Sequence, residues 1–280
     1  MRIDQLLVTA TQRLVPFSDT PRLDAELLLA YLLERERVWL YTWGDREVEP
    51  GTEARFHDLL AAREQGQPIA YLIGQREFWG LMLSTSKATL IPRPDTELLV
   101  EEALKRAQAA RGRLLDLGTG TGAIALALAS ERPQWSVFGV DIIEAAVQLA
   151  RTNATRLGMS NVHFMRSDWF SAFGENERFD IIVSNPPYLA DSDPHLERGD
   201  VRFEPRSALI AAQDGLADLY HLARSAQDYL EPGGWLLVEH GMAQGEAVQA
   251  VFRASGFIDV ETCHDLGGRP RVTLGHVAHG

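Results

Sequence analysis

The chain has 280 residues, 45% of them apolar and 24% charged, which is ordinary usage for a globular protein large enough to bury more than one core. Its 39 acidic residues outnumber 27 basic ones, and the net charge of −12 disfavours a protein that wraps DNA through a basic surface. The single cysteine, Cys263, excludes an intramolecular disulfide, and no Cys/His cluster has zinc-ligand spacing. No charged-then-apolar leader and no apolar run of membrane-spanning length is visible, so we expect a cytoplasmic protein that binds no metal and no membrane.

Residues 1–75 predict a small helical domain. Helical spacing places five apolar residues on one stripe: Ile3, Leu6, Leu7, Ala10 and Leu14. Thr20 as N-cap and Pro21 in the first turn predict the start of a second helix, and a further helix is expected over residues 52–64. This bundle is either mere packing or a regulatory cap, or it docks a substrate; its place ahead of a catalytic domain, together with the family resemblance given below, favours docking. Three aromatic residues are candidates either for a contact surface or for the core: Trp39, Tyr41 and Trp43.

Residues 76–90 alternate enough to predict a β-hairpin linker, and residues 91–280 predict an α/β domain. A helix is expected from Pro94, near its N1 position, to about Ala109. After it, strands are expected near residues 114, 137, 163, 181 and 236, and helices near residues 124, 147, 220 and 247. Strands that alternate with helices indicate a doubly wound parallel sheet with right-handed crossovers.

A glycine-rich turn follows the first of these strands. The run is Gly118-Thr119-Gly120-Thr121-Gly122, and a helical stretch follows it. Such a turn lets a ligand approach the backbone closely at a helix N-terminus. The next strand ends in Asp141, 23 residues beyond Gly118, where a carboxylate suits the hydroxyls of a ribose. NAD and S-adenosylmethionine both fit this pattern. After the third strand, Asp168 is placed to accept from an adenine amino group, and Trp169 either packs on the adenine ring or belongs to the core.

The run Asn185-Pro186-Pro187-Tyr188 follows a buried apolar strand. Two prolines lock the backbone and have no N–H group, so their carbonyls are free to accept hydrogen bonds. With the oxygen of Asn185 and the flat face of Tyr188, they form a rigid acceptor site for a planar –NH2 group; the alternative is a stiff turn. Dehydrogenases have no evident need for this run, and the glycine spacing departs from G-x-G-x-x-G, so S-adenosylmethionine is favoured over NAD.

Several blocks together resemble the HemK/PrmC family, the protein-(glutamine-N5) methyltransferases that act on class I peptide chain release factors. The blocks are residues 63–74, 77–80, 90–97, 116–122, 167–170, 185–188 and 203–209. The glycine loop and the Asn-Pro-Pro-Tyr run are shared with other amino-methylating enzymes, including those that act on DNA. The run Ile-Pro-Arg-Pro-Asp-Thr-Glu at residues 91–97 and the helical N-terminal region narrow the resemblance to this family. A mild departure lies at residues 266–271, where a proline interrupts the expected hairpin.

The resemblance implies a seven-stranded, Rossmann-like S-adenosylmethionine-dependent methyltransferase domain behind a small helical domain. It implies methylation of the glutamine in the Gly-Gly-Gln motif of release factors. The implied catalytic residues are Asn185, Pro186 and Tyr188, and Pro187 joins them in substrate binding. The implied cofactor-binding residues are Gly118, Thr119, Gly120, Thr121, Gly122, Asp141, Asp168, Trp169 and Asn185. The last two strands, near residues 258–262 and 271–274, resemble the antiparallel pair that ends such a sheet.

Two other functions are left open by the residues. One is an amino-methyltransferase for DNA or RNA, which the acidic balance and the lack of a nucleic-acid module disfavour. The other is a cofactor-binding protein without activity, against which the intact Asn-Pro-Pro-Tyr run argues. We expect a monomer that does not bind nucleic acid directly. The segment 189–215 is long for a connection and predicts a lid or a substrate loop, in which Arg206 has either a specific role or only a solvated charge.

Overall fold

The computed structural model describes residues 1–279, which form two compact units. The helical unit comprises Met1–Gln75 and, from much later in the chain, Pro194–Phe203. The sheet unit comprises Arg76–Asp193 and the chain from Glu204 onward. No helix within residues 1–279 has the length and apolar character needed to cross a membrane.

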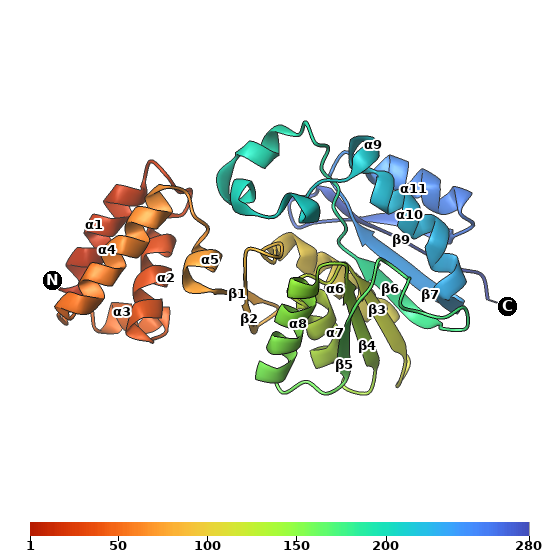
Figure 1. The fold of residues 1–280 in the computed structure, drawn as a ribbon, viewed down its shortest axis with the longest axis horizontal. Coiled ribbons are helices and arrows are strands. Elements are labelled where there is room, and N and C mark those ends of the chain that lie inside the picture. Colours follow the sequence, from red (N-terminus) through yellow and green to blue (C-terminus); the bar gives the residue numbers. More distant parts are fainter. Residues whose placement is uncertain (280) are drawn as a thin grey trace. The chain divides into compact units, whose positions relative to one another are not determined.

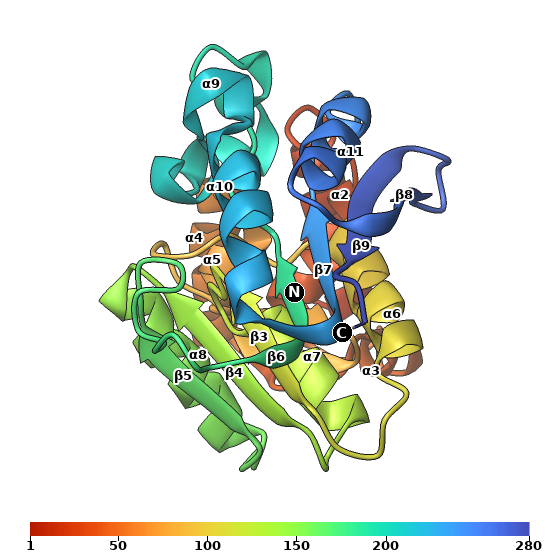
Figure 2. The same ribbon diagram turned by 90° about the vertical axis from the view of Figure 1, so that its right-hand side faces the viewer.

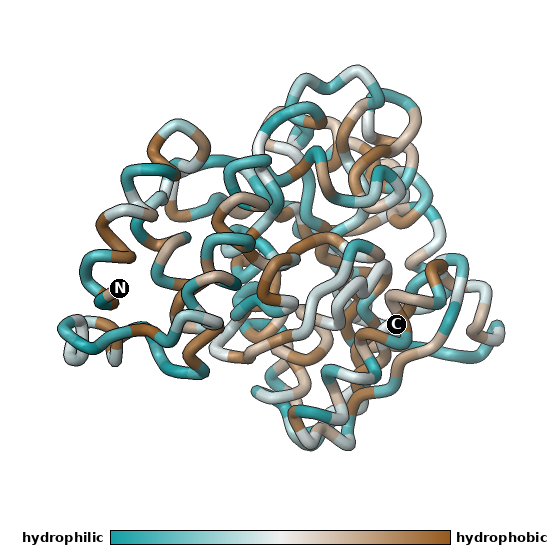
Figure 3. Tube along the Cα trace, turned by 60° about the vertical axis from the view of Figure 1, so that its left-hand side comes forward, coloured by the Kyte–Doolittle hydropathy of each residue, from teal (hydrophilic) through white to brown (hydrophobic). Residues whose placement is uncertain are grey.

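The helical unit is a bundle around one apolar core (Figure 1). Its helices are α1 (Ile3–Leu14), α2 (Pro21–Leu33), α3 (Arg37–Thr42), α4 (Pro50–Glu64) and α5 (Ile69–Ile73). The apolar stripe expected on the first helix is buried in full. Hydrophobic and hydrophilic stretches alternate along this part of the trace, as amphipathic helices require (Figure 3). Of the three candidate aromatics, Trp39 packs against the core, whereas Tyr41 and Trp43 are exposed.

A buried arginine joins residues 194–203 to the rest of the helical unit. Arg63, on α4, donates from Nε to Oδ2 of Asp24 at 2.7 Å and from Nη1 to Oδ1 of Asp200 at 2.8 Å. Its Nη1 also donates to the carbonyl oxygen of Gln67 at 3.1 Å. The two carboxylates raise the pKa of Arg63 against the opposing effect of burial, so the guanidinium stays charged. The sequence did not indicate this grouping, because Asp200 lies 137 residues from its partner.

The sheet unit contains the expected seven-stranded sheet, with the order β5-β4-β3-β6-β7-β9-β8. Its strands are β3 (Arg113–Leu117), β4 (Ser136–Asp141), β5 (Val162–Arg166), β6 (Phe179–Ser184), β7 (Leu230–Glu239), β8 (Ile258–His264) and β9 (Pro270–His276). The first five pair in parallel, and β9 pairs antiparallel with both β7 and β8. The predicted doubly wound methyltransferase sheet is thereby confirmed. A separate two-stranded sheet joins β1 (Gln75–Phe78) and β2 (Leu81–Ser84).

Helices cover both faces of this sheet (Figure 2). One apolar core lies between the sheet and α6 (Glu97–Arg106), α7 (Ala123–Glu131) and α8 (Glu144–Arg156). A second core lies on the other face under α10 (Ala217–Ser225) and α11 (Gly245–Ala254). A 3-10 turn over Pro94–Thr96 precedes α6, so the chain turns helical at the predicted proline but ends at Arg106 rather than near Ala109. Two-sided burial explains why the central strands are continuously apolar rather than alternating.

The segment after the Asn-Pro-Pro-Tyr run consists of short turns rather than regular helices. It contains the 3-10 helices η2 (Pro194–Glu197), η3 (Gly199–Phe203) and η4 (Arg206–Ala208), followed by the short helix α9 (Ala212–Gly215). Backbone bonds tie Leu189 to Leu209 and Ala211, so the two ends of this loop are pinned side by side. Arg206 is exposed and pairs with Asp191 at 2.6 Å, an ion pair in solvent.

We expect Arg63→Met to destabilise the helical unit by about 3 kcal/mol, because it leaves the buried Asp24 and the anchor Asp200 without their cation. Chemical denaturation measures the loss, and limited proteolysis should show faster cleavage within residues 194–203. Arg55→Met is the matched control, since Arg55 is exposed on the same helix. Equal stability of the two variants would contradict the anchoring role.

Candidate active site

The register of the parallel strands brings four distant residues into one row. Leu117 on β3 pairs with Val140 on β4 and with Ser184 on β6, and Ser184 pairs with Val238 on β7. In sheet order, the residues that follow these four are Asp141, Gly118, Asn185 and Glu239. They therefore meet at the carboxyl edge of the sheet, where open α/β sheets bind their ligands.

The glycine loop after β3 is held open by hydrogen bonds to its neighbour strand. The N–H groups of Gly118 and Thr119 donate to the carbonyl oxygen of Val140 at 2.9 and 2.8 Å. Gly118 and Gly120 have φ angles of +73° and +54° and line a cleft, and a Cβ atom built on either meets nothing closer than 3.9 Å. A ligand can thus approach this backbone. Gly122 does not line the cleft, because it packs against Phe164 and other side chains of the core.

Two carboxyl groups, one fully and one partly buried, support the loop. Asp116 is fully buried, and its Oδ2 accepts from Oγ1 of Thr119 at 2.6 Å and from the N–H of Ala125 at 3.2 Å. Burial raises the pKa of Asp116 to about 7. Asp141 accepts from the N–H groups of Gly120 at 3.0 Å and Ile143 at 2.9 Å, and burial raises its pKa as well. Each oxygen of Asp141 accepts one of these bonds and keeps a lone pair for a ligand hydroxyl.

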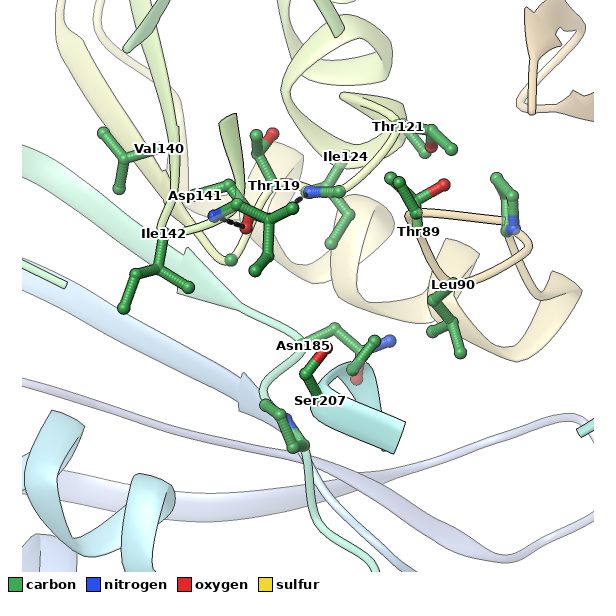
Figure 4. A pocket seen from close by; sticks show the side chains of 18 of the residues that line it. Thr89, Leu90, Thr119, Thr121, Ile124, Val140, Asp141, Ile142, Asn185 and Ser207 are labelled. Atoms are coloured by element: carbon green, nitrogen blue, oxygen red, sulfur yellow. Dashed lines mark hydrogen bonds between the residues drawn. The ribbon is translucent and has the colours of Figure 1, made fainter. Parts of the chain in front are cut away.

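The cleft has a volume of about 290 Å³ and lies wholly within the sheet unit. Figure 4 shows Thr119 and Asp141 on one of its walls and Asn185 beside Ser207 on another. Ile142 lines it with half of its apolar side chain exposed, which suits the face of a flat ring. Asp168 and Trp169 line the cleft too, and Trp169 also packs against the second core.

The Asn-Pro-Pro-Tyr run leaves β6 at the cleft. Ser184 ties the strand end to β3 through a 2.7 Å bond from its hydroxyl to the carbonyl oxygen of Leu117. Asn185 and Pro187 line the cleft, whereas Pro186 and Tyr188 are outside its lining. Asn185 donates from Nδ2 to Oγ1 of Thr96 at 3.2 Å, so its side-chain oxygen is not used in that bond.

Tyr188 is held from two sides. Its hydroxyl makes a long 3.4 Å contact to Oε1 of Glu239, and burial, followed by the charge of Glu239, raises its pKa. Its carbonyl oxygen accepts from Nε2 of Gln244 at 3.0 Å. Gly215, with φ +83°, lies so close that a Cβ atom there would stand 2.1 Å from this carbonyl oxygen. Gln213 and Asp214, just before it, also have positive φ angles, so a strained left-handed turn presses against the Asn-Pro-Pro-Tyr run.

Sequence reasoning missed several residues of this site. Thr96 lies in the Ile-Pro-Arg-Pro-Asp-Thr-Glu block, whose pattern indicates the family but gives no contact for the threonine hydroxyl. Glu239 ends an apolar strand in the same way as Asp141, and that pattern was a usable signal. Asp218, on α10, lines the cleft without any motif around it.

Cys263 is half-buried, and burial raises its pKa to about 11, which leaves it a poor nucleophile. Residues 1–279 contain no cluster of three or more side chains fit to hold a metal ion.

Comparison with known proteins decides the family. The PrmC N-terminal domain profile matches residues 5–74, and a methyltransferase domain profile matches residues 109–262. The chain is 57% identical to a release factor glutamine methyltransferase of Salmonella typhimurium, over 92% of this chain and 93% of that protein. The chain belongs to the release factor glutamine methyltransferase family. A Vibrio cholerae protein of the same name is 52% identical over 98% of this chain and 96% of its own length.

A solved structure supports the fold of this methyltransferase independently. A methyltransferase from Pyrococcus furiosus superposes with a TM-score of 0.54 at 19% identity, over 71% of this chain and 90% of that one. The relatives therefore confirm the resemblance to the HemK/PrmC family that the sequence showed. The solved structure confirms the predicted methyltransferase fold.

The cleft of this methyltransferase fits S-adenosylmethionine, the cofactor of its fold. The backbone above Gly118 and Gly120 is open to a ligand, and Asp141 has lone pairs for ribose hydroxyls. Ile142 offers an apolar face for adenine. Carboxyl groups along this edge suit a ligand that carries a positive sulfonium.

We expect Gly215→Ala to lower the rate of methyl transfer by about 10-fold or more, because the new methyl group displaces the carbonyl oxygen of Tyr188. Cofactor affinity should stay within about twofold of the original protein. Gly268→Ala is the matched control: its φ of +75° imposes similar backbone strain, but a Cβ atom there meets nothing within 4 Å. Steady-state kinetics and calorimetric cofactor binding measure both quantities, and equal rates in the two variants would contradict the contact.

Proposed function

We propose that this enzyme transfers a methyl group from S-adenosylmethionine to the side-chain amide nitrogen of the glutamine in the Gly-Gly-Gln motif of class I peptide chain release factors. The modification would modulate translation termination. The observation that carries the proposal is the position of Asn185, which follows β6 and lines the cleft in the same row as the glycine loop and Asp141. An acceptor group for an –NH2 substrate thus lies beside the cofactor site, within a chain that belongs to the release factor glutamine methyltransferase family.

The chemistry follows from what an amide requires. A glutamine nitrogen is a poor nucleophile because its lone pair is delocalised into the carbonyl group. S-adenosylmethionine, when bound, supplies a methyl group made reactive by the positive charge on its sulfur. The oxygen of Asn185 and the carbonyl oxygen of Pro186 would accept the two N–H bonds of the glutamine, and Tyr188 would pack on the amide plane. Holding reactants in this way contributes about 7–11 kcal/mol in favourable cases.

No strong base is needed beside the glutamine nitrogen. Its proton becomes acidic only once the new N–C bond has formed, so it can leave to solvent afterwards. The buried carboxyl group of Glu239 contacts the hydroxyl of Tyr188 and lies beside Thr96, so it is not assigned the role of that base. Positioning and exclusion of water therefore carry most of the catalysis.

The helical unit is proposed to dock the release factor. The α3 helix and its C-cap expose apolar and aromatic side chains at Val38, Tyr41 and Trp43. Exposed apolar groups that lie together in this way suit a protein contact surface. The net charge of −12 suits a protein substrate with a basic surface better than a nucleic acid. We further propose that the enzyme acts as a monomer in the cytoplasm, without direct contact to nucleic acid, and that residues 189–215 contact the substrate.

The proposed acceptor is tested by offering labelled S-adenosylmethionine with three substrates in parallel. These are a purified class I release factor, its Gly-Gly-Gln→Gly-Gly-Ala variant and duplex DNA. Label on the unchanged release factor alone is the expected result, and mass spectrometry should place it on the glutamine. Label on DNA alone would move the enzyme to the nucleic-acid methyltransferases, and label on the Gly-Gly-Ala variant would place the acceptor elsewhere.

Asn185→Ala should lower kcat for release factor methylation by about 100-fold or more, because the variant cannot orient the substrate amide. Binding of S-adenosylmethionine, followed by calorimetry, should change by no more than about threefold. Asn176→Ala, at an exposed position in the turn before β6, is the control and should match the original protein. A variant at position 185 that keeps most of its turnover would exclude the proposed role of this side chain.

A further inference from the structure

Asn185 is a useful acceptor only if its side-chain amide is turned the right way. A primary amide has an oxygen that accepts and a nitrogen that donates, and the two ends are nearly equal in shape. If the amide is flipped, a donor faces the substrate –NH2 group, which is itself a donor. The rate of the reaction therefore depends on whatever group fixes this orientation.

Among residues 1–279, the side chain of Asn185 hydrogen-bonds with the hydroxyl of Thr96. A hydroxyl both donates and accepts, so by itself it would tolerate either orientation of the amide. Thr96 is 4% exposed and lies in the turn before α6, so water does not compete freely for its hydroxyl. The orientation must then come from the next group along the chain of hydrogen bonds.

That next group is Glu239, at the end of β7. Glu239 is 2% exposed; its carboxyl group lies beside Thr96, whose hydroxyl acts to lower the pKa of Glu239, and it contacts the hydroxyl of Tyr188 at 3.4 Å. An ionised carboxylate accepts only. The single proton of the Thr96 hydroxyl is therefore given to Glu239, and the hydroxyl oxygen is left to accept from Nδ2 of Asn185. The amide of Asn185 thus donates toward Thr96, the hydroxyl of Thr96 donates toward Glu239, and the oxygen of Asn185 is left for the substrate.

We propose that Glu239 and Thr96 are positioning residues that fix the orientation of the Asn185 amide, and that Glu239 also orients Tyr188 on the other side of the substrate amide. The kinetic test of this proposal rests on the proposed function, because it needs a release factor as substrate. The structural test needs no substrate and depends only on the contacts among Asn185, Thr96 and Glu239. Neither residue touches the reacting atoms. Thr96 lies 89 residues before Asn185 and Glu239 lies 51 residues after Tyr188, so only the fold assembles this chain.

The charge of Glu239 is set by its surroundings. Burial raises its pKa to about 7, the hydrogen bond from Thr96 and the charge of Arg271 on β9 act to lower it, and Asp95 acts to raise it. Arg271 also pairs with Asp95 at 3.1 Å and with Asp265 at 3.4 Å. One oxygen of Glu239, Oε2, has no hydrogen-bond partner among residues 1–279, which makes the loss of its charge at lower pH less costly.

The kinetic test uses a double-mutant cycle under single-turnover conditions with a release factor as substrate. Thr96→Val removes the hydroxyl at nearly constant shape and should slow methyl transfer by about 10- to 100-fold. Thr96→Ser restores the hydroxyl and should restore most of the rate. Because Thr96 acts through Asn185, adding Thr96→Val to Asn185→Ala should cost little further. Full additivity of the two losses, or an unchanged rate in Thr96→Val, would overturn the proposal.

Glu239→Gln tests the direction in which the hydroxyl of Thr96 donates its hydrogen bond, while a polar side chain is kept at position 239. The new amide can donate to Thr96, which is then free to donate to Asn185 and to favour the flipped orientation. We expect a loss similar to that of Thr96→Val, with cofactor affinity within about twofold. Glu102→Gln, a buried glutamate on α6 that pairs with Lys105 and Arg106, controls for the loss of a buried charge and should keep its rate. Equal rates in the two glutamine variants would overturn the role of Glu239.

The pH profile gives a second kinetic readout. As pH falls through about 7, Glu239 takes up a proton, becomes a donor and no longer fixes the chain, so the rate of the unchanged enzyme should fall. Glu239→Gln should lack this component. Asp116, whose pKa burial also raises to about 7, remains in both proteins, so the difference between the two profiles reports Glu239. Superimposable normalised profiles would contradict the assignment.

An NMR measurement without substrate separates this inference from the proposed function. The side-chain NH2 signals of Asn185 are assigned by their loss in Asn185→Ala. They should be shifted and slow to exchange in the unchanged protein, and should lose both properties in Thr96→Val and Glu239→Gln but not in Glu102→Gln. If no release factor were methylated while these signals behaved as expected, the acceptor would be wrong and the hydrogen-bond chain right. Signals insensitive to Thr96→Val would overturn the chain itself.

Discussion

Parallel pairing of β3 with both β4 and β6 is the constraint on which the site depends. The three strands are in register at Leu117, Val140 and Ser184, so the residues after them leave the sheet at one level. β7 extends the row, since Val238 pairs with Ser184. A shift of one residue in any of these pairings would turn a site residue to the opposite face of the sheet. The continuously apolar strands, buried under helices on both faces, are what keep the register fixed.

This constraint explains what could be predicted from the sequence. An apolar run followed by Gly118, Asp141 or Asn185 marks a strand end, and parallel strands place such ends together, so the cleft was predictable without coordinates. The hydrogen-bond partners were not. Thr96 and Glu239 meet Asn185 and Tyr188 from other elements, and no local pattern tells which hydroxyl or carboxyl a side chain will find. Gly215 is similar, because only the packed turn shows that a methyl group there would strike Tyr188.

The charges of the site follow one physical rule. Asp116, Asp141 and Glu239 stand along the carboxyl edge of the sheet, and burial raises the pKa of each. Keeping carboxyl groups in such a place costs folding free energy, which the backbone N–H groups around Asp116 and Asp141 partly offset. Glu239 is the least compensated, because one of its oxygens is unpartnered within residues 1–279. Groups retained against such a cost usually serve function rather than stability.

The residues proposed to hold the substrate –NH2 group are separate from the parts of the protein that would select the substrate. In the proposed mechanism, any –NH2 substrate that reached Asn185 would meet the same acceptors, because strand register and the proposed contacts with Thr96 and Glu239 fix them. The sheet edge alone therefore cannot distinguish a glutamine from an adenine. Selection has to come from parts of the chain outside the sheet, and the helical unit is the largest of them. Residues 194–203 belong to that unit although they follow the Asn-Pro-Pro-Tyr run closely in sequence. Within that unit, Arg63 on α4 ties them to α2 through a buried ion pair with Asp24 and a partly exposed one with Asp200.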